Sequence, residues 1–276
     1  EPLVLFIPEK AILLAKAFWP GPLTIILEKS PLIPYETTAG LNTLALRMPE
    51  NPIALTLIKE SGLPIGAPSA NRSGRPSPTC ARHVLEDLGG SIPLILDGIE
   101  PCRVGLESTV IDLTGNEPII LRPGSITPKM IEETIGKIKL DNGILSTPMD
   151  GESPKAPGMK YLHYSPKAPV TIYKGKDLRK LTTRINSIYN KYVRDGKKTG
   201  ILATDETLAL YNQDNVISLG SRKEPATIAF NLFASLRQMD DLGVDVILAE
   251  WIEEEDEGLA IMNRMMRAAG FTVVDI

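Results

Sequence analysis

Residues 170–269 alternate between short apolar runs and longer amphipathic stretches, and this alternation limits the choice of fold more than any other feature of the chain. Strands separated by helices of these lengths are typical of a parallel, doubly wound sheet. The pattern therefore predicts a small α/β domain in this part of the chain. The expected elements are strands at residues 170–173, 200–203, 216–219 and 244–249 and helices at residues 178–194, 226–241 and 257–269.

The preceding part of the chain mixes apolar strands with helices in a less regular order. The turn residues 114–118 predict that the strands on either side of them form a hairpin. Asn51 lies before Pro52 as a candidate helix N-cap. The expected elements are strands at residues 3–7, 23–27, 44–48, 65–67, 94–96, 108–113 and 119–122 and helices at residues 9–18, 52–61, 79–88 and 128–138.

Residues 141–168 show no apolar periodicity and are rich in Pro, Gly, Ser and Lys, a composition typical of a linker. We therefore expect a first domain at residues 1–138, a linker at residues 139–168 and a second domain at residues 169–276. The length of 276 residues is consistent with two domains.

The composition argues against several classes of protein. The net charge of −4 gives no overall attraction to nucleic acids or anionic membranes. The longest apolar stretches are far shorter than the roughly 20 residues of a membrane-spanning helix. Two cysteines and two histidines are too few for a disulfide framework, a four-thiolate zinc site or a metal site with several histidine ligands, so we predict no metal site.

The loop at residues 68–78 is the first candidate site. It follows the apolar residues 65–67 and offers the hydroxyls of Ser69 and Ser77, while Arg72 and Arg75 could neutralise phosphate. Ligands commonly bind beyond the ends of strands in open α/β sheets. The alternative is a connecting turn rich in Ser and Pro, which composition alone favours because short motif matches often mislead. The common nucleotide-binding glycine motifs are absent from the sequence, so an ATP site here would be of a less familiar type.

Three further candidates lie next to strands. Ser108 and Arg122 are at the two ends of the predicted hairpin, so we expect them to lie close together at one end of a sheet. Arg47 follows another strand. An arginine in such a position is suited to a phosphate or a carboxylate, and a surface ion pair is the alternative for each. No residue is assigned as a catalytic acid, base or nucleophile.

Taken together, these segments resemble the YrdC-like family of L-threonylcarbamoyladenylate synthases in its longer, two-domain form. Six motifs carry the resemblance in the family's order: residues 18–24 (FWPGPLT), 46–49 (LRMP), 67–74 (APSANRSG), 107–110 (ESTV), 121–124 (LRPG) and 157–166 (PGMKYLHYSP). The resemblance implies an α/β protein with a twisted open sheet and flanking helices, followed by a smaller Rossmann-like, doubly wound C-terminal domain.

The resemblance also implies a cytoplasmic nucleotidyltransferase that uses L-threonine, bicarbonate and ATP, with Mg²⁺ carried by the ATP. The product, threonylcarbamoyl-AMP, is used for the N6-threonylcarbamoyladenosine modification of tRNA. The implied partners are therefore tRNA and tRNA-modification proteins, and no interaction with a membrane is implied. The residues that match the family's threonine contacts are Arg47, Ala67 and Ser108. Those that match its ATP contacts are Thr43, Ser69, Ser77, Arg122 and Tyr164.

This sequence departs from the family pattern at its start. The family carries a Thr and a Lys-x-Arg cluster before the strand that corresponds to residues 1–7, and the chain as written does not contain them. The resemblance therefore implies that part of the threonine and phosphate site is missing and that this chain is inactive as written.

Two other functions are consistent with parts of the pattern. One is an RNA-binding module without catalytic activity, in which Arg72, Arg75, Arg82 and Arg103 would contact phosphates, although interleaved aromatic residues for base stacking are absent. The other is a carbamoyl-transfer domain of hydrogenase maturation, which shares the core fold. The cysteine arrays of that class are absent from this sequence.

Overall fold

A computed structural model describes residues 2–98, 102–146 and 163–276. The described chain forms two compact units. The first unit contains residues 2–68 and 107–144, and the second contains residues 69–98, 102–106, 145–146 and 163–276. The second unit is thus assembled from separate stretches of sequence. The domain boundaries expected at residues 138 and 169 stay a prediction.

The first unit has a five-stranded sheet in the order β2-β1-β3-β4-β5. Strands β1 and β3 are parallel, whereas β2 and β4 run antiparallel to their neighbours β1 and β3. Helices α1 and α4 contact each other and contribute Leu14 and Ile131 to the buried core. The elements are α1 (Glu9–Phe18), β1 (Leu23–Glu28), β2 (Thr43–Leu46), α2 (Pro52–Ser61), β3 (Thr109–Asp112), β4 (Ile119–Arg122), α4 (Pro128–Ile135) and β5 (Lys139–Leu140).

Side-chain caps mark where two helices of this unit begin. The Asn51 side chain accepts hydrogen bonds from the backbone N–H groups of Ile53 and Ala54, which confirms the N-cap expected from the sequence. Thr127 accepts a hydrogen bond from the N–H of Met130 at the start of α4. Each of these caps is followed directly by proline, whose missing N–H is no loss at the first helical position.

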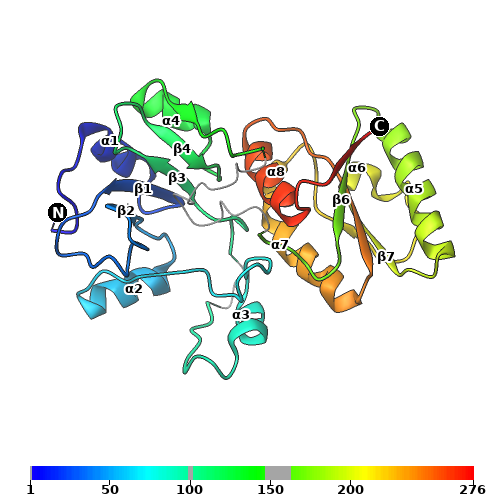
Figure 1. The fold of residues 1–276 in the computed structure, drawn as a ribbon, viewed down its shortest axis with the longest axis horizontal. Helices are drawn as coiled ribbons and strands as arrows, with labels where there is room; N and C mark the ends of the chain where they lie inside the picture. The colour runs from blue at the N-terminus through cyan, green and yellow to red at the C-terminus, as the bar shows by residue number, and fades with distance from the viewer. Residues whose placement is uncertain (1, 99–101, 147–162) are drawn as a thin grey trace. The chain divides into compact units, whose positions relative to one another are not determined.

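The second unit has a parallel sheet in the order β10-β6-β9-β7-β8. Figure 1 shows β6 and β7 of this sheet between α5 on one side and α7 and α8 on the other. This confirms the doubly wound sheet predicted from the alternation of strands and helices. Its elements are α3 (Ala81–Leu88), β6 (Val170–Lys174), α5 (Leu178–Arg194), β7 (Thr199–Ala203), α6 (Asp205–Leu208), β8 (Val216–Ser218), α7 (Pro225–Leu242), β9 (Val246–Glu250), α8 (Glu257–Ala268) and β10 (Val273–Asp275).

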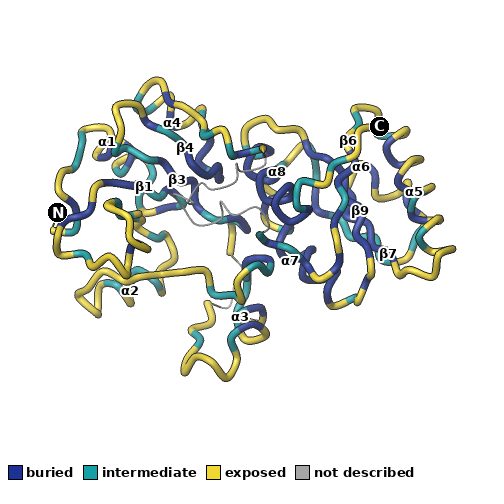
Figure 2. Tube along the Cα trace, viewed as in Figure 1, coloured by how far each residue is buried: buried dark blue, intermediate teal, exposed yellow. Residues whose placement is uncertain are grey.

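Two apolar cores cover the two faces of this sheet. Along β9, Ile247 and Ala249 join the core that includes α7 and α8, and Val246 and Leu248 join the core that includes α5. Successive strand residues point to opposite faces, so a strand that is apolar throughout must be covered on both. Figure 2 shows that α8 is buried along almost its whole length and that α7 is buried along the face that packs in the core.

Three strands expected from apolar runs are absent from the described structure. Residues 3–7 contribute only an isolated bridge between Val4 and Lys29, and Phe6 is 72% exposed. Residues 65–67 and 94–96 have no regular structure, and their side chains are mostly exposed. An apolar run becomes a strand only where a neighbouring strand supplies hydrogen-bonding partners, which a local pattern does not show.

The sequence analysis also missed three short elements. They are β5, α6 and β10, of two, four and three residues. Elements this short contain at most about one and a half periods of a helical or alternating pattern, so periodicity could not reveal them. The linker expected at residues 139–168 lies largely outside the described residues.

A fully buried carboxylate joins several elements of the second unit. Glu250, at the end of β9, accepts hydrogen bonds from Thr204 Oγ1 at 3.0 Å, Thr207 Oγ1 at 2.6 Å and Tyr211 OH at 2.8 Å. Arg222 Nη2 lies 2.9 Å from the same carboxylate and supplies the opposite charge. Burial, together with the negative charge of Glu250, raises the pKa of Tyr211, so this phenol remains a donor.

We predict that Glu250→Ala lowers the free energy of unfolding of the second unit by about 3 kcal/mol, because it leaves a partly buried Arg222 without its counter-charge. Urea unfolding followed by circular dichroism measures the change. The control is Glu253→Ala, which removes an exposed carboxylate three residues along the chain and should change stability by no more than about 0.5 kcal/mol. Equal effects of the two substitutions would contradict the prediction.

Candidate functional site

Three of the predicted site residues gather at one end of the sheet in the first unit. Because β1 and β3 are parallel and β2 and β4 run the other way, the starts of β1 and β3 meet the ends of β2 and β4. Arg47 follows the end of β2, Ser108 precedes β3 and Arg122 ends β4. We call these three residues, with Thr24 of β1, the sheet-end cluster.

Ser108 and Arg122 are in direct contact, as the predicted hairpin required. Arg122 donates from Nε and Nη2 to the Ser108 carbonyl oxygen at 3.1 and 3.0 Å, and from Nη2 to Ser108 Oγ at 3.2 Å. Thr24 Oγ1 lies 2.7 Å from Ser108 Oγ. Ser108 and Arg122 are both buried, so these contacts orient the guanidinium and the hydroxyl. The sequence analysis assigned no role to Thr24, although it lies within the first of the six motifs.

Arg47 is held against the turn that precedes β1. Its Nε donates to the carbonyl oxygen of Gly21 at 3.0 Å, and the Gly21 N–H donates to the carbonyl of Met48 at 2.8 Å. The next residue, Pro22, accepts a hydrogen bond from the Thr109 N–H at 3.0 Å. The turn therefore connects the end of β2 to the start of β3.

Gly124 shows how closely the chain passes this end of the sheet. A Cβ at this position would lie 2.5 Å from the backbone nitrogen of Thr109 and 2.9 Å from the carbonyl oxygen of Glu107. Both neighbours are backbone atoms, so any other residue would force the two segments apart. The glycine keeps the segment after Arg122 against the start of β3.

The other predicted site residues lie elsewhere. Thr43 begins β2 at the opposite end of the sheet, where it pairs with Glu28 of β1. Ala67 is exposed in a segment of the first unit without regular structure. Ser69, Ser77 and Tyr164 belong to the second unit. The assignment of these residues to threonine and ATP stays a prediction.

Within the second unit, Ser69 and Ser77 differ in burial. Ser69 is exposed, whereas Ser77 is 7% exposed. Tyr164 is buried in the core, where its ring packs against Phe233 with a centroid separation of 5.1 Å.

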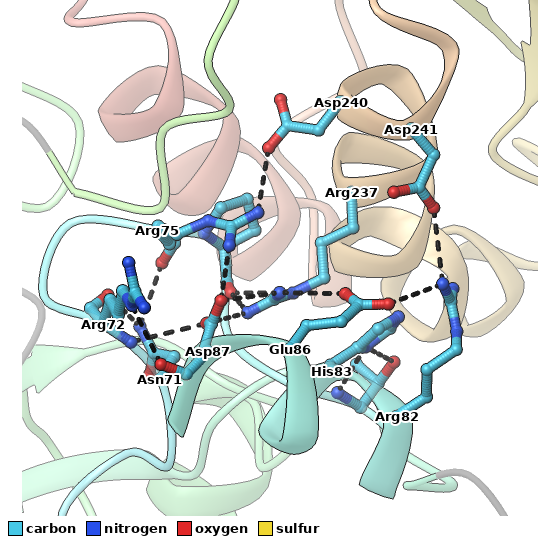
Figure 3. A network of polar contacts seen from close by, with 12 residues as sticks. Asn71, Arg72, Arg75, Arg82, His83, Glu86, Asp87, Arg237, Asp240 and Asp241 are labelled. Carbon is cyan, nitrogen blue, oxygen red and sulfur yellow. Dashed lines mark hydrogen bonds and ion pairs between the residues drawn. The ribbon is translucent and has the colours of Figure 1, made fainter. Parts of the chain in front are cut away.

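A network of charged residues holds the loop at residues 69–78 against helices α3 and α7 (Figure 3). The Asp87 carboxylate, whose side chain is fully buried, pairs with Arg75 and with Arg237, the latter at 2.7 Å. Arg75 also reaches Asp240 at 3.2 Å. We call Arg75, Asp87, Arg237 and Asp240 the loop network. Local sequence could not reveal it, because Asp87 and Arg237 are 150 residues apart.

These contacts change the interpretation of the arginines near the loop. Arg72 donates from Nε to the backbone carbonyl of Asp87 at 2.9 Å, and Arg75 pairs with two carboxylates. Arg82 pairs with Glu86 at 2.7 Å. The sequence suggested that these arginines bind phosphate. Carboxylates within the chain, however, already oppose the positive charges of Arg75 and Arg82.

The network also affects the ionisation of its members. Burial raises the pKa of Asp87, but the hydrogen bonds and charge of Arg237, with the charge of Arg75, outweigh burial and hold this pKa below its ordinary value. Burial and the positive charges of Arg237 and Arg82 lower the pKa of His83. A neutral His83 agrees with its geometry, because its Nδ1 accepts a hydrogen bond from the Thr79 N–H at 3.2 Å.

Two family models match the chain, and together they cover nearly all of it. The model described as "Telomere recombination" matches residues 2–124, and the model described as "Threonylcarbamoyl-AMP synthase, C-terminal domain" matches residues 126–270. The threonylcarbamoyl-AMP synthase of Pyrococcus abyssi is 48% identical over 271 residues, which is 98% of this chain and 76% of that protein. The chain belongs to the threonylcarbamoyl-AMP synthase family.

Further relatives agree with this membership. The threonylcarbamoyl-AMP synthase of Bacillus subtilis is 47% identical over 97% of this chain and 75% of its own length. The crystal structure of P. abyssi Sua5 complexed with L-threonine superposes with a TM-score of 0.92 and 47% identity, covering 100% of this chain and 78% of that one. The predicted family, α/β fold class and activity class, a nucleotidyltransferase, are confirmed.

Asp87→Asn tests the electrostatics of the loop network. Because the pKa of Asp87 is lowered by folding, its stabilisation is fully present above the unfolded carboxyl pKa of about 3.9 and is lost as the pH falls through the lower folded value. We expect the substitution to cost about 3 kcal/mol at pH 7 and less at pH 3, where the carboxyl of the unfolded chain is already protonated. Thermal unfolding at the two pH values measures this difference.

Asp241→Asn is the matched control, because Asp241 of α7 faces an arginine as Asp87 of α3 does, but the Asp241 side chain is 53% exposed. Its effect should stay within about 0.5 kcal/mol at both pH values. A cost of Asp87→Asn that is the same at pH 3 and pH 7 would contradict the electrostatic explanation.

Proposed function

We propose that this chain, joined to the family's Lys-x-Arg segment, forms L-threonylcarbamoyladenylate and pyrophosphate from L-threonine, bicarbonate and ATP. One observation carries the proposal: Arg47, Ser108 and Arg122 converge at one end of a sheet in a chain of the threonylcarbamoyl-AMP synthase family. An end with two guanidinium groups and a hydroxyl is suited to an anionic amino acid and a triphosphate.

The reaction joins three substrates through a carbamate. The threonine amine and bicarbonate form the carbamate with loss of water, and a carbamate oxygen then attacks the α-phosphorus of ATP as pyrophosphate leaves. Arg47 binds the threonine carboxylate, Ala67 lines the amino-acid pocket and Ser108 contacts the substrate through its hydroxyl. Arg122 offsets the charge that grows on the departing pyrophosphate. Because the carbamate is unstable in water, exclusion of water is an essential part of catalysis.

ATP would contact Thr43, Ser69, Ser77, Arg122 and Tyr164, with Mg²⁺ bound to its phosphates. Across residues 2–98, 102–146 and 163–276, the structure contains no group of three or more His, Cys, Asp or Glu side chains that could hold a metal ion. In the proposed reaction, Mg²⁺ enters the site on the phosphates of the nucleotide substrate.

The product would supply the N6-threonylcarbamoyladenosine modification of tRNA in the cytoplasm, where tRNA and tRNA-modification proteins are the expected partners. None of the helices described in the structure is long and apolar enough to cross a bilayer. The alternative, an RNA-binding module without chemistry, finds less support, because Arg75 and Arg82 already face carboxylates.

The reaction itself gives the first test of the proposal. We expect pyrophosphate release from ATP that requires both threonine and bicarbonate, measured with a coupled phosphate assay. The assay is run on the 276-residue chain and on an N-terminally extended form that carries the family's Lys-x-Arg segment. Salt-dependent RNA binding without ATP turnover in the extended form would favour the alternative, and turnover without threonine dependence would overturn the assignment.

Arg47→Ala tests the threonine site. Loss of a charge-assisted hydrogen bond to the carboxylate should raise KM for threonine by about tenfold or more and leave KM for ATP within about twofold. Steady-state kinetics of the active form measures both constants. Lys59→Ala, which removes an exposed cation of the same unit, is the control and should change neither constant. A rise confined to KM for ATP would assign Arg47 to the nucleotide instead.

A further inference from the structure

Helix α7 of the C-terminal sheet contacts the main chain of the loop at residues 69–78, and Arg237 makes that contact. Its Nε and Nη2 donate to the carbonyl oxygen of Pro76 at 3.1 and 2.6 Å. The same guanidinium pairs with the Asp87 carboxylate, and the Arg237 side chain is only 2% exposed. One planar group thus connects the loop backbone to helix α3.

The position of the Pro76 carbonyl determines the orientation of the next residue. The carbonyl of Pro76 and the N–H of Ser77 belong to one planar peptide unit, so holding the oxygen also holds the plane in which the N–H lies. Ser77 is one of the two loop residues assigned to ATP. Arg237 therefore fixes the orientation of the peptide that contains the Ser77 N–H, although its own helix lies more than a hundred residues later in the chain.

Two further contacts attach the loop at other points. The Ser165 N–H donates to the carbonyl oxygen of Gly74 at 2.8 Å. Arg75 lies between the carboxylates of Asp87 and Asp240, and Asp240 also accepts a hydrogen bond from the Lys167 N–H at 2.7 Å. Three consecutive loop residues are thus each held by a partner. Ser165 holds Gly74, Asp87 and Asp240 hold Arg75, and Arg237 holds Pro76.

Helix α7 has an apolar anchor separate from these polar contacts. The helix buries Ile228, Leu232, Phe233, Leu236 and Met239 in the core on one face of the sheet. That apolar contact is sufficient to anchor the helix. A fully buried arginine is costly unless its hydrogen bonds are satisfied, so its placement on the loop needs a reason other than helix packing.

We propose that Arg237 is a positioning residue for ATP binding: helix α7 holds the peptide at Pro76 and Ser77 in the orientation that the nucleotide requires. The inference rests on the proposed function and extends it, because it gives the C-terminal domain a role in binding a substrate. ATP then meets a loop whose conformation is already set, and binding does not have to order it.

The test is Arg237→Lys, which keeps a positive charge beside Asp87 but cannot reach both the carboxylate and the Pro76 carbonyl with a planar fork. We expect KM for ATP to rise by about tenfold and KM for threonine to stay within about twofold. The amides of residues 72–75 and of Ser77 should exchange with deuterium faster in the variant. The control is Arg194→Lys, an exposed arginine at the end of α5, which should change none of these quantities.

Arg75→Gln provides a second variant if Arg237→Lys does not fold, because the Arg75 side chain is 28% exposed and its replacement is less disruptive. It should also raise KM for ATP selectively. A selective rise in KM for ATP, measured at a temperature where the variant remains folded, supports the proposal. Unchanged kinetics, or equal rises in KM for both substrates, would overturn it.

Calorimetric titration of the N-terminally extended form with Mg·ATP, with and without the substitution, separates failure of this inference from failure of the proposed function. If the wild-type protein binds ATP but shows no threonine-dependent turnover, the proposed reaction is wrong, and a dissociation constant about tenfold higher in Arg237→Lys still supports the positioning role. If the variant binds ATP as tightly as the wild-type protein, the positioning role is wrong even where the enzyme is active. If the wild-type protein does not bind ATP, both are wrong.

Discussion

The parallel pairing of β1 and β3 is the constraint on which the arrangement of the first unit depends. Parallel neighbours cannot be joined by a tight turn, so the chain must return through a long crossover before β3 begins at Thr109. This crossover includes β2, α2, the loop at residues 69–78 and α3. Most of the residues assigned to substrates, from Thr43 to Ser108, thus belong to one connection between two adjacent strands.

The sequence was most informative where a pattern is long. Helix α5 was expected at residues 178–194 and occupies Leu178–Arg194, because its apolar positions repeat over several turns. The strands expected at residues 65–67 and 94–96 failed because three apolar residues do not show whether a partner strand lies beside them. The contact between Ser108 and Arg122 was predictable because a hairpin brings the ends of its two strands together.

Other parts of the site could not be predicted, since they depend on contacts between distant segments. Arg72 and Arg75 have the residue type of phosphate ligands, and nothing near them in the sequence indicates that Asp87 and Asp240 oppose the charge of Arg75. Thr24 was similarly hidden, because its contact with Ser108 requires the register of β1 against β3. The family resemblance identified the motifs, and the structure adds the partners of each side chain.

The non-contiguous composition of the second unit has a consequence for how the protein is made. The chain enters this unit at residue 69, leaves it after residue 106 and contributes Arg237 only much later. A ribosome adds roughly 5–20 residues per second, so the 150 residues between Asp87 and Arg237 take on the order of ten seconds or longer to synthesise. During that interval α3 and the loop before it are already made but lack their partner helix. The nascent chain must therefore keep Asp87 hydrated until α7 emerges, and this segment can reach its final conformation only after α7 has been synthesised.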